Sequence, residues 1–274
     1  MRQRLKPALV NFSLWNFGGF AFHCKAVMKA SSILKKLVSC LVAALTVIAL
    51  LLLLGNGGTL PWFPPPLVFS LIGLCLLTAL FYPFIWQQQE RKQKVATYNI
   101  YGFLNTLIRY ALAFNLASFG WKKIFGLQFV VPPAIAAVPL NQQSGEWLTW
   151  FYFGYSPAFG LLLALFQIAG ACLLLFRQTV LPAAVALFAF MLPLTLINVF
   201  YGLNAGALTQ AVLLTTGLAY LILEDYQRLK IFFLKTLPGL PSLPVKSRTA
   251  KNIVRLSALL LSLLFTLYLK SNMH

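Results

Sequence analysis

Arg109 is the residue in this chain most able to do chemistry, because it is a cation inside a long apolar run. The run covers residues 99–119, about the 20 residues that a helix needs to cross a bilayer. A cation at that depth is costly unless it is solvated or paired. All four acidic residues lie outside the apolar runs, so we expect no carboxylate partner for Arg109 within the membrane.

Two interpretations of Arg109 stay open. In the first, its guanidinium donates hydrogen bonds to neighbouring helices and sets how they pack. In the second, it binds an anionic or carbonyl-bearing ligand, since ionisable groups inside a membrane often mark functional sites. The ligand-binding residues would then be Arg109, Asn105, Lys123, Gln167, Asn198 and Tyr201.

Lys123 follows Arg109 at helical spacing, about 21 Å away if the helix continues at about 1.5 Å per residue. It either extends to lipid headgroups or forms a basic mouth above a polar cavity. Trp147, Trp150 and Tyr155 are more typical of an aromatic belt at the membrane interface than of a site.

Seven apolar runs are predicted to form the helices that position these residues. They cover residues 37–54, 67–86, 99–119, 151–176, 180–201, 207–223 and 253–269. The middle four carry polar and small residues at helical spacing, which favours close helix packing. We therefore predict a four-helix bundle from these four, with the Leu-rich first and last runs as lipid-facing anchors.

The composition supports an all-α polytopic membrane protein. Hydrophobic residues make up 60% of the 274 residues and charged residues 9%, and the mean hydropathy is +0.81. The 22 Lys and Arg residues outnumber the four acidic ones. With the N-terminus in the cytoplasm, 18 of these cations fall inside and three outside, so the positive-inside rule predicts an outer C-terminus.

The chain divides into five predicted segments. A basic cytoplasmic segment (1–36) precedes a transmembrane hairpin (37–94), the four-helix core (95–230), a proline-rich cytoplasmic linker (231–252) and a C-terminal transmembrane helix (253–274). The stretch 7–24 is either an interfacial amphipathic element or lies ahead of the true start, because Met28 begins a typical basic leader. The outer stretch 131–146 contains three prolines and is not expected to be one continuous helix.

Several kinds of site lack support in the sequence. The four cysteines form no C-x-x-C pair, the two histidines lie near the ends, and no metal-binding set is expected. Nucleotide-binding and common hydrolase motifs are absent from the sequence. The excess positive charge lies in loops between apolar runs, which favours anionic lipids as partners rather than nucleic acid.

A resemblance to a known family rests on five short motifs. They are residues 109–113, 120–129, 153–156, 167–170 and 198–201. Across residues 98–229 the chain resembles the DoxX family of bacterial membrane proteins, with Lys123 at the lysine of the family's Gly-x-x-Lys pattern. The resemblance implies a four-helix core in the bacterial inner membrane and a link with membrane redox systems.

Three functions are compatible with this sequence. The first is a subunit of a membrane redox system that binds a quinone near Arg109 and works with a redox partner protein. The second is a non-catalytic scaffold in which Arg109 is structural. The third, a transporter of a small anion, ranks lower because no inverted repeat is visible. Whether the protein is an enzyme stays open.

Overall fold

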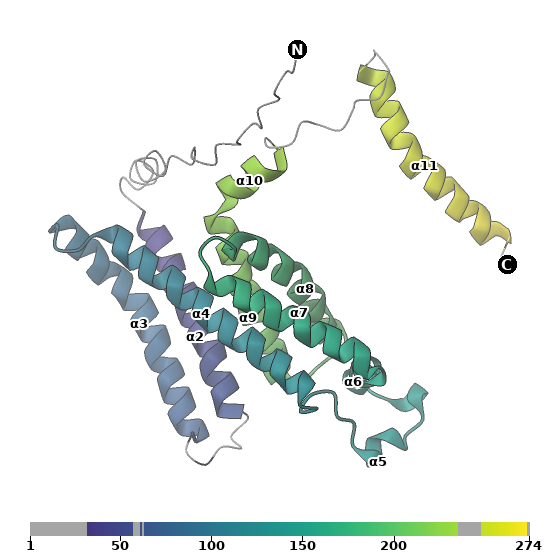
Figure 1. Ribbon diagram of the computed structural model, residues 1–274, viewed down its shortest axis with the longest axis horizontal. Coiled ribbons are helices and arrows are strands. Elements are labelled where there is room, and N and C mark those ends of the chain that lie inside the picture. The colour runs from purple at the N-terminus through teal and green to yellow at the C-terminus, as the bar shows by residue number, and fades with distance from the viewer. Residues whose placement is uncertain (1–31, 57–60, 62, 235–247, 273–274) are drawn as a thin grey trace, which may run out of the picture. The chain divides into compact units, whose positions relative to one another are not determined.

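The computed structural model describes residues 32–56, 61, 63–234 and 248–272, and these residues form helices and no strand (Figure 1). The chain divides into two units, Met1–Tyr226 and Gln227–His274. The helices of the first unit are α2 (Ile33–Gly55), α3 (Pro65–Arg91), α4 (Thr97–Ile124), α5 (Pro133–Ala136), the 3₁₀ helix η2 (Leu140–Gln142), α6 (Gly145–Tyr155), α7 (Pro157–Leu175), α8 (Val180–Phe200) and α9 (Ala205–Glu224). Helix α10 (Tyr226–Leu234) begins at the boundary, and α11 (Arg248–Asn272) belongs to the second unit.

Five of these helices are long and apolar enough to cross a membrane: α2, α3, α7, α8 and α9. In lipid each must satisfy its backbone hydrogen bonds internally, which a helix does. The prediction of an all-α polytopic membrane protein is therefore confirmed, with five candidate spans. The predicted count of seven also requires α4 and α11, which are not among the five.

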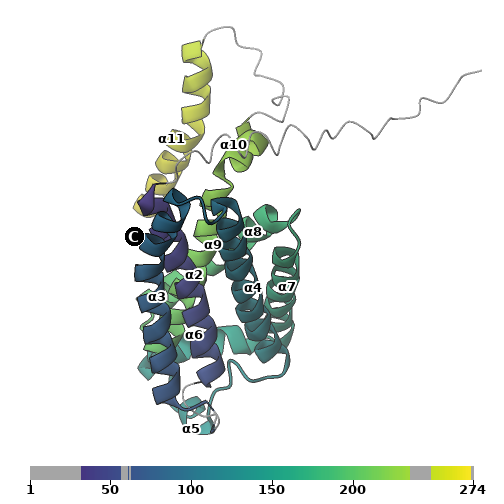
Figure 2. The same ribbon diagram turned by 90° about the vertical axis from the view of Figure 1, so that its left-hand side faces the viewer.

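Helix α2 belongs to the protein core, so the prediction that it is a lipid-facing anchor is wrong. It packs against α3, α4 and α9, and Figure 2 shows it beside α3 and α4. Ser39, Ala43, Thr46 and Ala49 recur at helical spacing and are buried. Such small residues let the neighbouring backbones approach closely, and the leucines around them concealed this stripe in the sequence.

The four middle helices pack in a chain of neighbours, α4 on α7, α7 on α8, and α8 on α9. Helix α2 contacts both α4 and α9, so the core contains at least one helix beyond the predicted four. A glycine permits one of these contacts. A Cβ atom on Gly120 of α4 would lie 3.0 Å from the Ala164 carbonyl oxygen of α7.

The predicted continuous helix over residues 151–176 is wrong, because two helices occupy this stretch. Helix α6 ends at Tyr155 and α7 begins at Pro157, with Ser156 extended between them at φ −113° and ψ 110°. A residue before proline is pushed out of the helical region. The Ser156 Oγ accepts a hydrogen bond from the Phe159 amide at 3.3 Å and caps α7. The stretch 131–146, as predicted, is no continuous helix.

The beginning of α2 is tied to the ends of α3 and α9. The Lys36 ammonium is fully buried and donates to the side chains of Gln87 and Glu90. Lys35 forms an ion pair with Glu224 of α9 at 3.5 Å. Two lysines at the start of α2 therefore form ion pairs with Glu90 and Glu224, two of the four acidic residues in the chain.

Helix α11 contains the predicted last span, residues 253–269, and its described apolar side chains are mostly exposed. The predicted element at 7–24 and the proline-rich part of the linker, 237–244, lie outside the described residues.

Candidate functional site

Lys123 and Gln167 meet where the last turn of α4 packs on α7. The Lys123 Nζ atom donates to the Gln167 Oε1 atom at 2.8 Å and to the Phe119 carbonyl oxygen at 3.4 Å. Gln167 is only 3% exposed. The ammonium therefore turns back into the helix interface instead of extending toward headgroups.

The partners of the Lys123 ammonium are all neutral. Besides these two oxygens, the ammonium lies 5.6 Å from the centre of the Phe129 ring, within cation–π range. The described residues give Lys123 no salt bridge. Its positive charge is thus half-buried without a compensating anion, which leaves it able to attract an anionic or carbonyl oxygen.

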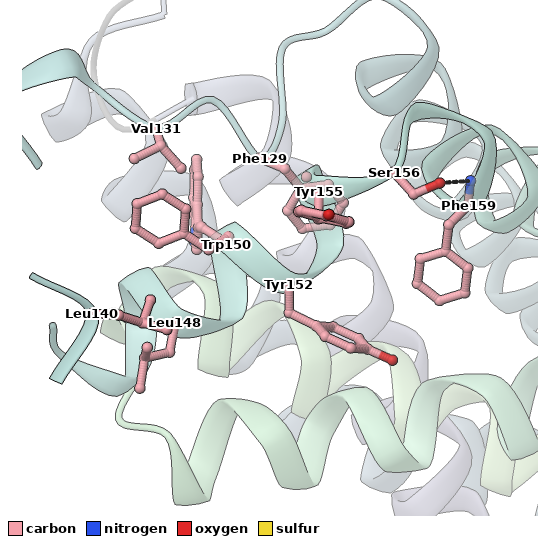
Figure 3. Close-up of a pocket in the computed structure, with 11 residues that line it drawn as sticks. Phe129, Val131, Leu140, Leu148, Trp150, Tyr152, Tyr155, Ser156 and Phe159 are labelled. Carbon is pink, nitrogen blue, oxygen red and sulfur yellow. Dashed lines mark hydrogen bonds between the residues drawn. The ribbon is translucent and has the colours of Figure 1, made fainter. Parts of the chain in front are cut away.

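An aromatic pocket lies beside this pair, at the junction of the α4–α5 loop with α6 and α7. Its volume is about 820 Å³, which falls in the range of small-molecule sites. It is lined by Phe129, Val131, Leu140, Leu148, Trp150, Phe151, Tyr152, Gly154, Tyr155, Ser156 and Phe159 (Figure 3). Such a lining suits a flat or apolar group better than a hydrated ion.

Phe129 belongs to both the pocket and the lysine site. Its ring lines the pocket, stacks on Phe153 at 5.2 Å and meets Trp150 edge-on at 6.2 Å, measured between ring centres. The same ring lies against the Lys123 ammonium. Phe129 therefore contacts both an apolar pocket and a half-buried cation.

Arg109 caps the end of α7. Its Nε atom donates to the Leu174 carbonyl oxygen at 2.9 Å, and one terminal nitrogen donates to that of Leu175 at 2.7 Å. The last carbonyls of a helix have no partner within the helix, and a cation there also meets the negative end of the helix dipole. Arg109 is 8% exposed, and these two hydrogen bonds hold its guanidinium within the protein.

The six predicted ligand-binding residues do not form one cluster of hydrogen bonds. Only Lys123 and Gln167 are joined directly. Asn198 donates to the Leu194 carbonyl oxygen of its own helix at 2.6 Å, and Tyr201 is half exposed just after α8. The carbonyl oxygens of the Asn105 and Asn198 side chains are buried without a hydrogen-bond partner.

The sequence does not predict the aromatic pocket, because Trp150 and Tyr155 are typical of an interfacial belt. A usable signal was present, because six aromatic residues fall within residues 147–155 and Phe159 follows on the next helix. What the sequence did not reveal was that the break at Ser156 folds α6 and α7 around one pocket.

Within the described residues, no group of three or more His, Cys, Asp or Glu side chains could hold a metal ion. Cys40, Cys75 and Cys172 are free thiols.

Comparison with protein-family models, curated proteins and solved structures found no match. The resemblance to the DoxX family therefore stays a prediction.

Proposed function

We propose that this chain is a DoxX-like protein of the bacterial inner membrane that binds a quinone or a similar lipophilic ligand as a subunit of a membrane redox system. One observation carries the proposal: the half-buried Lys123 ammonium has only neutral partners and lies against Phe129, which lines an aromatic pocket. The proposed contact with the ligand therefore moves from Arg109 to Lys123 and Gln167, because Arg109 is already bonded to the end of α7.

The proposed binding mode follows from the chemistry of the Lys123 ammonium and of the aromatic pocket. The Lys123 ammonium would donate a hydrogen bond to a carbonyl oxygen of the head group. The ring would lie among the aromatic side chains of the pocket, where offset or edge-on contacts are favourable. The quinone supplies the electron-carrying chemistry, and a partner protein exchanges electrons with it.

The proposed topology has seven spans, with α4 and α11 as the third and the seventh. The N-terminus would lie in the cytoplasm and the C-terminus outside, because 18 of the Lys and Arg residues then face inward. The ion pairs that join the start of α2 to the ends of α3 and α9 suit this alternation. In this topology Lys123 and the aromatic pocket lie toward the outer leaflet.

Binding of decylubiquinone to the purified protein tests the proposal, with tryptophan fluorescence as the signal because Trp150 lines the pocket. We expect saturable quenching by the wild type. Lys123→Met should bind about tenfold more weakly, since about 1.4 kcal/mol is a typical loss for one charge-assisted hydrogen bond. Lys122→Met is the matched control, because the Lys122 ammonium donates to Asn56 at 3.2 Å instead.

Equal affinity of the wild type and Lys123→Met, or no saturable binding at all, would refute the proposed site.

A non-catalytic scaffold is the second candidate, and the contacts of Arg109 favour it. Both hydrogen bonds of its guanidinium join α4 to the end of α7, a structural use of an intramembrane cation. A scaffold would retain Arg109 as a packing residue and bind no decylubiquinone, so the same titration separates the two functions.

A further inference from the structure

Phe129 has a backbone conformation that is unusual for a bulky residue. Its φ is +65°, in the left-handed region that aromatic residues rarely adopt. Conformations of this kind persist only where the surroundings hold them, and they cluster at ligand clamps and switches. Phe129 follows the end of α4 in a loop without regular secondary structure.

The surroundings that hold Phe129 can be named. Its carbonyl oxygen packs so closely on α6 that a Cβ atom on Gly154 would lie 2.9 Å from it. Its ring stacks on Phe153. Three residues earlier, Gly126 also has a positive φ, +64°, which glycine adopts without strain. The loop thus carries a permissive residue close to a strained one.

We propose that Phe129 is a gate between the aromatic pocket and the Lys123 ammonium, and that a lipophilic ligand with a carbonyl or anionic head displaces its ring to reach that ammonium. For the identity of the ligand, this inference rests on the proposed function. The test of the gate does not, because the Lys123 ammonium lies 5.6 Å from the centre of the Phe129 ring without any ligand.

The contacts that the Phe129 ring loses on displacement are comparable with those that the ligand gains. With the gate closed, the ammonium interacts with the π face of the Phe129 ring, a weaker contact than a hydrogen bond to a charged or strongly polar oxygen. Displacement of the ring loses that contact and the stacking on Phe153. It gains the hydrogen bond to the ligand head. The arrangement can therefore open for a ligand and close without one.

Acylation of lysines by a water-soluble N-hydroxysuccinimide ester, located by tandem mass spectrometry, tests the gate without any ligand. In the wild type we expect Lys123 to react much more slowly than Lys122. In Phe129→Ala the Lys123 rate should rise about tenfold, the order expected for removal of a partly desolvated cation–π contact. Phe125→Ala is the matched control, because Phe125 stacks on Trp121 instead.

A second variant keeps the gate testable if Phe129→Ala does not fold. Gly154→Ala keeps the Phe129 ring but places a methyl group against the Phe129 carbonyl, so it should also raise the Lys123 rate. The Lys122 rate and the elution volume of each variant report whether the fold is kept. Unchanged Lys123 acylation in both folded variants overturns the gate, as does fast acylation of Lys123 in the wild type.

Decylubiquinone then separates failure of the gate from failure of the proposed function. In Phe129→Ala the quinone should slow the acylation of Lys123 and leave that of Lys122 unchanged. If the variant exposes Lys123 but the quinone gives no protection, the gate stands and the quinone is the wrong ligand. Dodecanoate, with an anionic head, is the second probe for that case.

Discussion

At the scale of single residues, Arg109 and Lys123 of α4 have different partners. Arg109 donates to two backbone carbonyls at a helix end, whereas Lys123 donates to one amide side chain and one carbonyl. A guanidinium is planar and suits two neighbouring acceptors at once, while an ammonium is a compact charge that a new acceptor can approach. The geometry therefore favours a structural role for Arg109, and Lys123 is the proposed ligand contact.

Replacement of Arg109 should lower stability but not ligand affinity. Arg109→Gln removes the charge and leaves the Leu175 carbonyl without its donor, which should cost about 2 kcal/mol and lower the thermal unfolding midpoint in detergent. The decylubiquinone affinity should stay within about twofold of the wild type, an energy difference of less than about 0.5 kcal/mol.

Arg177→Gln is the control for Arg109→Gln, because Arg177 is an exposed cation just beyond the same helix end. A large loss of affinity in Arg109→Gln at unchanged stability would restore the interpretation of Arg109 as a ligand-binding residue.

At the scale of elements, small residues decide which helices form the core. Gly217 of α9 lies where α2, α4 and α9 meet: a Cβ atom there would be 2.8 Å from the Thr46 Cγ2 atom and 2.9 Å from the Leu112 Cδ2 atom. Helices in lipid associate through close packing rather than through the hydrophobic effect. A methyl group added at Gly217 would therefore push α2, α4 and α9 apart.

Gly217→Ala should destabilise the protein by about 1–3 kcal/mol, the usual range for overpacking a tight core. The loss would appear as a lower unfolding midpoint and a broader gel-filtration peak. Gly73→Ala is the matched control, since Gly73 also lies inside a helix but a Cβ atom there meets nothing within 4 Å. Equal stability of the two variants would contradict the three-helix contact.

At the scale of the whole molecule, the first unit is tied together at the end where α2 begins. Lys36 is buried and bonded to Glu90, and its ammonium lies 5.2 Å from the centre of the Trp86 ring. The Thr97 hydroxyl donates to the other Glu90 oxygen at 2.5 Å. One lysine and one glutamate thus join α2, α3 and the start of α4, so the N-terminal hairpin is part of the core.

A double-mutant cycle should separate this buried pair from the exposed pair beside it. Lys36→Met should cost about 3–5 kcal/mol, because it leaves a partly buried carboxylate unpaired. Adding Glu90→Gln should recover much of the loss. The cycle for Lys35 and Glu224, whose side chains are 50% and 26% exposed, should give an interaction energy of about 0.5 kcal/mol.

Equal interaction energies for the two pairs, measured by chemical unfolding in detergent, would show that Lys36 does not hold the hairpin.

Much of the fold could be predicted from the sequence because lipid leaves few choices. A long apolar run has to form a helix, and the five apolar spans are all helical where runs of hydrophobic residues predicted them. Errors arose where packing, not hydropathy, decides. The many leucines of α2 make its buried stripe of small residues hard to distinguish in the sequence. The single polar residue Ser156 does not interrupt the apolar run 151–176, which therefore predicts one helix where the structure has two.

The membrane character of this protein, the approximate extent of most of its apolar helices and the place of Arg109 and Lys123 along one of them follow from the sequence, because hydropathy and charge are properties of local residues. The partners of those cations, the place of α2 inside the core and the contact of Phe129 with both Lys123 and an aromatic pocket come from the tertiary structure. Each depends on which residues distant in the chain come within contact distance, such as Arg109 and Leu174, and side-chain periodicity does not encode this.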